Sequence, residues 1–346
     1  MVILGIDAHK RTHTVVAIDE AGRQLGTKTT LTTTTEAHLE MVRWADRFGP
    51  ERRFAVEDCR HLSRRLESDL LAAGEVIVRV PPKLMAHARA SARTYGKSDP
   101  IDALAVARAA LREPDLPVAR LDGPSRELRL LVDHREDLVR ERTGHINRLR
   151  WHLHELDPTW DPASRSLVRY MRLDAVAARL EGQGGMVARI ARDLVARIRE
   201  LTVQERALER EITTMVKKLA PRLLALPGVG ALIAAKIVAE TADIRRFRSK
   251  DAFARHNGTA PLPVWSSNRV RHRLSRTGNR QLNCSIHRMA VTQKRCHPDA
   301  RIYLDRRIAN GDTKLEALRA LKRKLSDVVY RALLADAVVG VVAEAA

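Results

Sequence analysis

Short β-branched apolar runs alternate with stretches of helical apolar spacing through the first third of the chain. Runs of the first kind predict strands, and stretches of the second kind predict helices. The predicted strands cover residues 2–6, 12–19, 24–32, 53–57 and 76–80. The predicted helices cover residues 35–48, 62–73, 83–92 and 100–111. We therefore expect a mixed sheet whose faces are covered by helices, which is an α/β domain.

From residue 124 onward the apolar spacing is almost entirely helical. Long charged helices are predicted over residues 125–156 and from the glycines at 182–185 to residue 219. Apolar residues of the second helix recur four and three positions apart, interrupted once by Glu205, which is typical of a coiled-coil seam. Two interpretations remain open at this point: a helical hairpin within one chain, and a dimer interface.

The last third is predicted to be mostly α-helical. Two apolar helices flank the turn LPGVG, and amphipathic helices are expected over residues 298–310 and 314–335. The last helix carries Arg319, Lys322, Arg323 and Lys324 on the side that we expect to face solvent. Glycines and prolines make residues 257–283 look irregular. The pattern thus predicts three regions, 1–123, 124–219 and 220–346.

Composition adds a partner class to this picture. The chain has 62 Lys and Arg against 42 Asp and Glu, a formal net charge of +20. The basic residues recur throughout instead of forming one amphipathic tail, which favours nucleic acid over a membrane surface. No run approaches the length of a membrane-spanning helix, and the first residues lack a signal-peptide pattern. We therefore expect a cytoplasmic protein with no membrane partner.

Acidic residues occur at the ends of the predicted elements. The predicted order of elements, βββαβαβα, is that of the ribonuclease H fold, in which the fourth strand lies beside the first. Asp7 follows the first strand and Glu57 ends the fourth. Asp99 and Asp102 stand three apart at a helix start marked by Pro100, so both can project from one turn. Like charges placed close together are costly without a cation. The four acids together predict a site for Mg²⁺ or Mn²⁺, ions that prefer oxygen ligands.

Basic residues crowd the C-terminal third with few acids between them. Such a cluster suits phosphates, and its binding would weaken with salt. The candidate nucleic-acid-binding residues are Arg245, Arg246, Arg248, Lys250, Arg269, Arg271, Arg273, Arg276 and Arg280. Between them Ser266 and Ser267 stand in the irregular segment, where a serine pair is ordinarily turn chemistry.

Taken together, these motifs resemble the bridge-RNA-guided DEDD insertion-sequence transposases of the IS110 class over nearly the whole chain. GIDAHK, the glutamate of FAVEDC and KSDPIDALAVA are similar to the acidic tetrad of that family's RuvC-like domain, which has the ribonuclease H fold. LPGVG, APLPVWSSN and HRLSRTGNRQLN are similar to its C-terminal transposase domain. The resemblance implies a tetrad of Asp7, Glu57, Asp99 and Asp102 and a serine nucleophile at Ser266. The family commonly has glycine after that serine, where this chain has Ser267.

The resemblance also implies a function and partners. Such a recombinase excises and inserts its element through a 5′-phosphoserine DNA intermediate. The RuvC-like domain of one protomer and the serine domain of another form a composite site, in a dimer or tetramer. A structured non-coding RNA selects the donor and target DNA. The implied location is the bacterial cytoplasm, at the nucleoid.

Two other functions fit the same residues. A RuvC-like nuclease would use the acidic tetrad and water, and would not need Ser266. An inactive nucleic-acid-binding remnant would keep the acids for structure alone. The first alternative needs the metal site and the second does not, so experiments on Asp7 and Ser266 separate all three.

Overall fold

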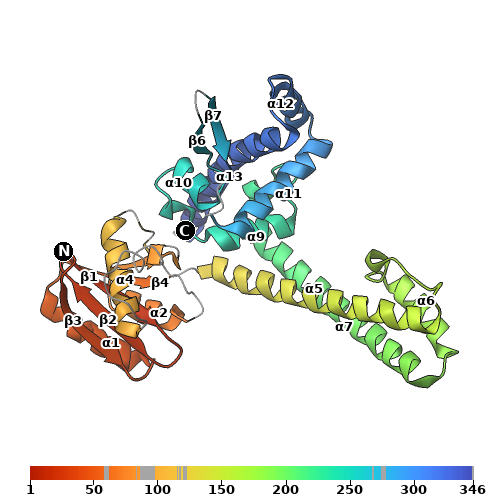
Figure 1. The fold of residues 1–346 in the computed structure, drawn as a ribbon, viewed down its shortest axis with the longest axis horizontal. Helices are drawn as coiled ribbons and strands as arrows, with labels where there is room; N and C mark the ends of the chain where they lie inside the picture. Colours follow the sequence, from red (N-terminus) through yellow and green to blue (C-terminus); the bar gives the residue numbers. More distant parts are fainter. Residues whose placement is uncertain are drawn as a thin grey trace. The chain divides into compact units, whose positions relative to one another are not determined.

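The computed structural model describes residues 1–57, 62–82, 84–85, 98–114, 116, 118–119, 123–266, 269–273 and 278–344. Of residues 264–266, 269–273 and 339–344 it describes the backbone alone. The chain divides into two compact units, Met1–Leu121 and Asp122–Ala346. Each unit is described by itself, and Figure 1 gives the labels of their elements.

The first unit is built on one five-stranded sheet. Its strands are β1 (Val2–Ala8), β2 (His13–Ile18), β3 (Gln24–Thr30), β4 (Arg52–Glu57) and β5 (Ile77–Val80). Its helices are α1 (Thr35–Ala45), the short η1 (Asp46–Phe48), α2 (Arg64–Ala72) and α4 (Asp99–Arg112). The spatial order is β3-β2-β1-β4-β5. Strand β1 runs antiparallel to β2 and parallel to β4, and β4 runs parallel to β5. This mixed sheet confirms the predicted ribonuclease H topology; most of the helix expected over residues 83–92 lies outside the described residues.

Alternation along β1 divides its side chains between the two faces of the sheet. Leu4 and Ile6 pack in the cluster that contains buried residues of α1 and α2. Ile3 packs on the opposite face, in the cluster dominated by α4. Gly5 and Asp7 share this second face with Ile3 because they are two and four residues further along. Helix α4 therefore covers the face on which Asp7 lies (Figure 1).

The backbone of α4 rests directly on β1 at Gly5. A Cβ atom at this position would lie 2.3 Å from the carbonyl oxygen of Ala103 and 2.4 Å from the amide nitrogen of Ala107. Both distances are far below a van der Waals contact, so only glycine permits this packing. Since Asp102 immediately precedes Ala103, the contact also fixes the first turn of α4 near Asp7.

The second unit begins with two long helices that pack along each other (Figure 1). Its first elements are α5 (Gly123–Leu156), the short η2 (Ser164–Ser166), α6 (Tyr170–Glu181) and α7 (Gly185–Leu219). Glu205, which interrupts the apolar seam of α7, is 7% exposed. Arg135 and Arg142 of α5 both contact its carboxylate, the latter at 2.9 Å. These buried ion pairs show that the seam closes a helical hairpin within one chain, as the first of the two interpretations held.

The remaining helices enclose the C-terminal core. They are α8 (Pro221–Leu224), α9 (Ala231–Thr241), the short η3 (Ile244–Arg246), α10 (Lys250–His256), α11 (Arg280–Cys296), α12 (Pro298–Ala309) and α13 (Lys314–Glu344). Leu282 and Met289 of α11 are fully buried and share one apolar cluster with Val329 of α13. This mostly helical architecture confirms the expectation for the last third.

The segment expected to be irregular contains an antiparallel pair of strands, β6 (Leu262–Ser266) and β7 (Arg269–Arg273). Pro263, one of the residues that argued against a strand, pairs with His272. In a two-stranded sheet each strand is an edge, and proline is tolerated at an edge because its missing N–H costs no bond of a central ladder. The expectation of an irregular segment was therefore wrong for residues 262–266 and 269–273, which form strands.

The base of this β6–β7 hairpin is held by close backbone contact. A Cβ atom at Gly278 would lie 2.3 Å from the amide nitrogen of Gly258. Beside it the Asn279 N–H donates to the carbonyl oxygen of His256 at 2.6 Å. The Asn279 side chain in turn donates to the Glu240 carboxylate of α9 at 2.7 Å. The two ends of the hairpin are thus joined to each other and to the helical core.

Lys322 of α13 is linked by hydrogen bonds to the segment that precedes the β6–β7 hairpin. We expected its side chain on the solvent face of the last helix, and this was wrong: Lys322 is 7% exposed. Its ammonium group donates to Asn283 Oδ1 at 2.7 Å, and the Asn283 amide donates to the carbonyl oxygen of Asn257 at 2.8 Å. Burial, and secondarily the charge of Arg280, lowers the pKa of Lys322. A chain of polar contacts therefore runs from α13 to the entry of the hairpin.

Replacing Gly5 by alanine should destabilise the first unit, because the new methyl group overlaps the backbone of α4. Overpacking of a core contact costs about 1–3 kcal/mol, and more where backbone must move. Urea unfolding followed by circular dichroism measures the loss. Gly144→Ala is the control: Gly144 lies within α5, and a Cβ atom at this position would meet nothing within 4 Å. Equal stability of Gly5→Ala and the unmodified protein would contradict the packing described.

Candidate active site

The four predicted carboxylates come from the ends of three elements of the first unit. Asp7 lies one residue from the end of β1, and Glu57 is the last residue of β4. The parallel register pairs Ile6 with Val56, so one further step places Glu57 beside Asp7 on the same face. Asp99 and Asp102 lie in the first turn of α4, the helix that covers this face. The backbone positions of the four residues therefore lie toward the same edge of the sheet.

Within this edge, three ligand atoms converge. One ligand atom each from Asp7, His9 and Asp99 lies within 4.8 Å of the other two. His9 Nε2 stands 3.0 Å from Asp7 Oδ2 and 3.3 Å from Asp99 Oδ1, so the imidazole bridges the two carboxylates. Among the described residues, Glu57 and Asp102 are not part of this closest group. The structure thus brings two of the four predicted acids together and adds a histidine.

The three groups of this cluster differ in their access to solvent. The Asp7 side chain is 8% exposed, whereas those of His9 and Asp99 are 48% and 50% exposed. Asp102 is buried on the inner side of α4. One carboxylate is therefore fixed in the protein interior and another meets solvent, which is the arrangement of a site open on one side.

The pKa of Asp7 is raised above its ordinary value. Burial raises that pKa first, and the neighbouring carboxylates of Asp102 and Asp99 raise it further, while His9 opposes the change. A carboxylate whose ionised form is disfavoured by burial and by like charges is stabilised by a bound cation. Two carboxylates with more acids beside them form an oxygen-rich donor set, which fits Mg²⁺ or Mn²⁺.

His9 was not predicted as a member of this cluster. Its signal was its distance from Asp7: residues two apart project to the same side of an extended chain. His9 follows directly after the end of β1, so this rule applies to it. The role of Gly5 was missed for a different reason, since a glycine inside a strand shows no partner helix in the sequence.

The candidate nucleophile lies in the second unit. Ser266 is the last residue of β6 and pairs with Arg269. The described part of the chain gives its backbone position, and Ser267 and Arg276 lie outside the described residues. The structure therefore places Ser266 at the turn end of the β6–β7 hairpin, opposite its base.

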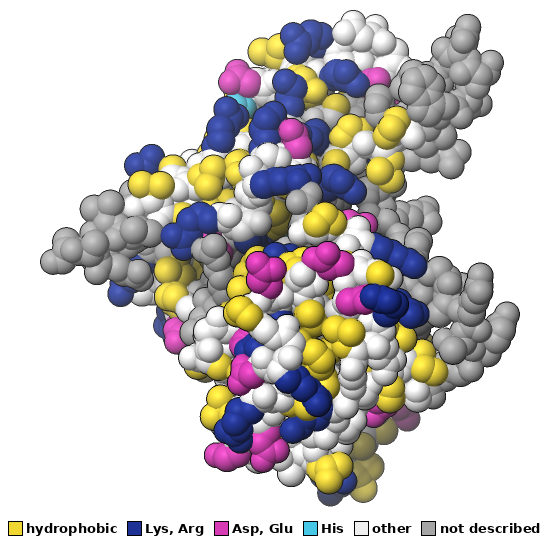
Figure 2. Space-filling model, turned by 90° about the vertical axis from the view of Figure 1, so that its left-hand side faces the viewer, with side chains coloured by type: hydrophobic (Ala, Val, Ile, Leu, Met, Phe, Trp, Pro, Cys, Tyr) yellow, Lys and Arg dark blue, Asp and Glu magenta, His cyan; other side chains and the backbone are white. Residues whose placement is uncertain are grey.

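The candidate phosphate-binding residues differ in their surroundings. Arg245 contacts Asp243 at 3.0 Å, and Arg246 lies over the ring of Phe247 at 4.6 Å. Lys250 lies 3.6 Å from Asp327. Arg269, Arg271 and Arg273 occupy alternate positions of β7. Arg280 is the first residue of α11, and Arg248 lies just before α10. On the face shown in Figure 2, Lys and Arg side chains gather over the upper part, which the C-terminal helices form. Among the residues described, no helix is both long and apolar enough to span a membrane.

Two models of transposase families match separate parts of the chain. A family model described as "Transposase", named for DEDD transposases of the IS110 type, matches residues 4–158. A second model, described as "Transposase IS116/IS110/IS902 family", matches residues 220–305. The first match contains Asp7, Glu57, Asp99 and Asp102, and the second contains Ser266.

Relatives of similar length come from bacterial insertion elements. The chain is 29% identical to an uncharacterized protein of insertion element IS116 from Streptomyces clavuligerus, covering 96% of this chain and 94% of the relative. It is 28% identical to an uncharacterized protein of IS900 from Mycobacterium paratuberculosis, covering 96% and 95%. It is also 28% identical to a protein of IS110 from Streptomyces coelicolor, covering 69% and 71%.

Among solved structures, Thermus thermophilus RuvC aligns with 33% of this chain and 95% of its own, at 19% identity and a TM-score of 0.28. The same protein in complex with a Holliday junction substrate covers 33% and 94%, at 17% identity and a TM-score of 0.27. The family assignment rests on the two matching models and on the relatives that align along most of the sequence. The chain belongs to the IS116/IS110/IS902 family of transposases.

Proposed function

We propose that this chain excises and inserts an insertion element by metal-dependent cleavage and exchange of DNA strands, through a phosphoserine intermediate and with a guide RNA. The observation that carries the proposal is the convergence of Asp7, His9 and Asp99 at one edge of the sheet, beside Glu57 and Asp102. In a transposase, a carboxylate cluster in this position has an evident use, because phosphodiester chemistry needs charge neutralisation.

Asp7 and Asp99 would hold Mg²⁺ or Mn²⁺ through carboxylate oxygens, with Glu57 and Asp102 as further ligands at the same edge. A bound divalent ion stabilises charge on the phosphate in the transition state and lowers the pKa of a nearby hydroxyl. Asp7 supplies the fixed part of the site because its side chain is 8% exposed. Asp99 and His9, each about half exposed, lie where the phosphate of a DNA strand would approach.

Ser266 is the proposed nucleophile. Its Oγ would form a bond to the phosphorus of the cut strand as the P–O3′ bond breaks, and the 3′ oxygen would leave with a proton. The strand would then be rejoined when a 3′-hydroxyl attacks this phosphorus: a new P–O3′ bond forms, the P–Oγ bond breaks, and the Ser266 oxygen leaves with the proton. Near the base of the hairpin that carries Ser266, the backbones of Gly258 and Gly278 are in contact, and the Asn279 side chain donates a hydrogen bond to Glu240.

A composite site formed by two protomers belongs to the same proposal. The acids lie in the first compact unit and Ser266 in the second, so the two halves of the chemistry are on separate bodies. Such a division suits an assembly in which the units of different protomers meet. The water-dependent nuclease is the second candidate function, and the same convergence of carboxylates favours it.

Asp7→Asn should weaken the binding of Mn²⁺ at least about tenfold and abolish strand cleavage, because it removes the buried anionic ligand. Isothermal titration calorimetry measures the affinity, and a radiolabelled DNA substrate measures cleavage. Glu20→Gln is the matched control, since that carboxylate is 75% exposed and lies outside the cluster. Unchanged Mn²⁺ affinity in Asp7→Asn would indicate the inactive remnant.

Ser266→Ala should eliminate covalent protein–DNA adducts on denaturing gels while leaving Mn²⁺ affinity unchanged. Ser267→Ala is the matched control, and it should still form adducts. If Ser266→Ala cuts DNA at the normal rate, the reaction uses water and the protein is a nuclease. If instead only Ser267→Ala loses the adduct, the nucleophile is the second serine.

RNA of one discrete sequence should co-purify with the protein expressed together with the DNA that flanks its gene. Sequencing of the extracted RNA checks this. The guide-RNA part of the proposal is supported by family membership and by the net charge of +20. A polydisperse mixture of cellular fragments would contradict it, because attraction by charge alone selects no sequence.

A further inference from the structure

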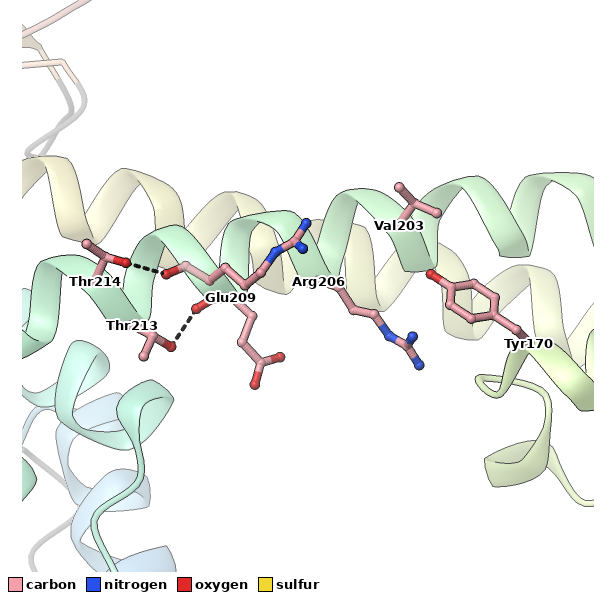
Figure 3. Close-up of a pocket in the computed structure, with 7 residues that line it drawn as sticks. Tyr170, Val203, Arg206, Glu209, Thr213 and Thr214 are labelled. Carbon is pink, nitrogen blue, oxygen red and sulfur yellow. Dashed lines mark hydrogen bonds between the residues drawn. The ribbon is translucent and has the colours of Figure 1, made fainter.

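Outside the proposed active site, the chain has a surface groove of about 950 Å³ where α6 meets α7. Tyr170, at the start of α6, forms one end, and Val203, Arg206 and Arg210 of α7 continue the lining. Figure 3 shows the Arg206 side chain and the Tyr170 ring directed toward each other. The seam of the helical hairpin is not involved, since these side chains lie on its outer surface.

The aromatic ring and the arginine form one unit. The Arg206 guanidinium carbon lies 4.4 Å from the centroid of the Tyr170 ring, and that of Arg199 lies 6.0 Å away. A cation over a tyrosine face at such a distance is attracted by the ring's quadrupole. The contact holds Arg206 beside the ring while its side chain stays exposed to solvent.

Charge in the groove is incompletely balanced. On the hairpin, Arg135 and Arg142 contact Glu205, Arg197 contacts Glu141, and Arg199 contacts Asp174. In the described part of the chain, by contrast, neither Arg206 nor Arg210 has an ion-pair partner. Glu209, the one acid in the lining, already contacts Arg135 at 3.0 Å. Two exposed arginines one helical turn apart are therefore available to an anionic partner.

The rest of the lining offers acceptors and apolar surface. The hydroxyl of Thr213 donates to the carbonyl oxygen of Glu209 at 2.6 Å, and that of Thr214 to Arg210 at 3.1 Å (Figure 3). Each hydroxyl oxygen keeps lone pairs that can accept a hydrogen bond. Val203 is 52% exposed and adds an apolar wall near the tyrosine.

We propose that this groove binds a segment of single-stranded nucleic acid. Arg206 and Arg210 pair with successive phosphates, since a guanidinium matches phosphate geometry with two hydrogen bonds. An unpaired base packs against Tyr170 and Val203, as bases do on aromatic platforms. A duplex fits less well because its bases are stacked inside and cannot reach the ring. This inference extends the proposed nucleic-acid function, but it needs neither the metal centre nor Ser266.

The test measures binding of the full-length protein to a fluorescent twelve-nucleotide oligothymidine by anisotropy, in EDTA so that no cleavage occurs. Arg206→Ala/Arg210→Ala should lower the affinity about tenfold at 0.1 M salt and reduce the salt dependence. The matched control is Arg165→Ala/Arg189→Ala, which removes two exposed arginines of the same unit that do not line the groove. Equal losses in the two double variants would overturn the proposal, since charge alone would then explain binding.

Tyrosine supplies the second arm. Tyr170→Leu should weaken binding of the single strand at least about fivefold, whereas Tyr170→Phe, which keeps the ring, should not. Binding to a twelve-base-pair duplex should be unaffected by Tyr170→Leu; an equal loss there would overturn the proposal. Polyglutamate serves as a competitor of the labelled oligonucleotide. If it displaces the label better than unlabelled oligothymidine does, and if this displacement requires Arg206, Arg210 and Tyr170, the partner is an acidic peptide and the proposal is overturned.

The proposed function and this inference fail separately. Asp7→Asn should bind the oligonucleotide as the unmodified protein does, whether or not it binds metal. Loss of cleavage with retained, Tyr170-dependent binding therefore leaves the groove assignment intact. If Tyr170→Leu binds the oligonucleotide as tightly as the unmodified protein does, while cleavage is intact, only the groove assignment is overturned.

Discussion

The first unit depends on one contact, that of the α4 backbone with β1 at Gly5. These two elements carry three of the four acids. The distance between β1 and α4 is set at Gly5, where the strand has no side chain. Any residue with a Cβ atom would have to displace the carbonyl oxygen of Ala103 and the amide nitrogen of Ala107 together. Since α4 is a stiff body of fourteen residues, displacement at its contact would move its first turn as well. The carboxylate cluster is therefore a consequence of backbone packing rather than of attraction between its members, which repel one another.

The second unit uses the same device at the hairpin base, where Gly278 meets Gly258. There the contact is reinforced by polar groups that are themselves buried, namely Glu240, Asn283 and Lys322. A buried ammonium group is costly unless its hydrogen bonds are satisfied. Lys322 donates a hydrogen bond to Asn283, and burial lowers the pKa of its ammonium group. Polar groups kept in this way favour one geometry for the segments that flank the β6–β7 hairpin.

Much of this arrangement could be predicted from the sequence. Strand and helix order gave the sheet topology, because β-branched runs and helical spacing are local signals. The placement of Asp7 and Glu57 followed, since parallel neighbours end at one edge of a sheet. What could not be predicted were contacts between distant segments: the seat of α4 on Gly5, the bridging position of His9 and the burial of Lys322. The β6–β7 hairpin was missed because Pro263 outweighed the β-branched residues around it, a weighting that fails at sheet edges.

The distribution of arginine pairs decides where the positive charge of the chain can act. A net charge of +20 suggests a uniformly attractive surface, yet several arginines of the helical hairpin are neutralised by acids of the neighbouring helix. Charges paired in this way add little to long-range attraction, because the field of each pair falls off steeply and is further screened by salt. Binding must therefore concentrate where arginines lack such partners and where the surface is hollowed. On the hairpin both conditions are met beside Tyr170, and there the aromatic ring adds a preference that charge cannot supply, the preference for a strand whose bases are unpaired.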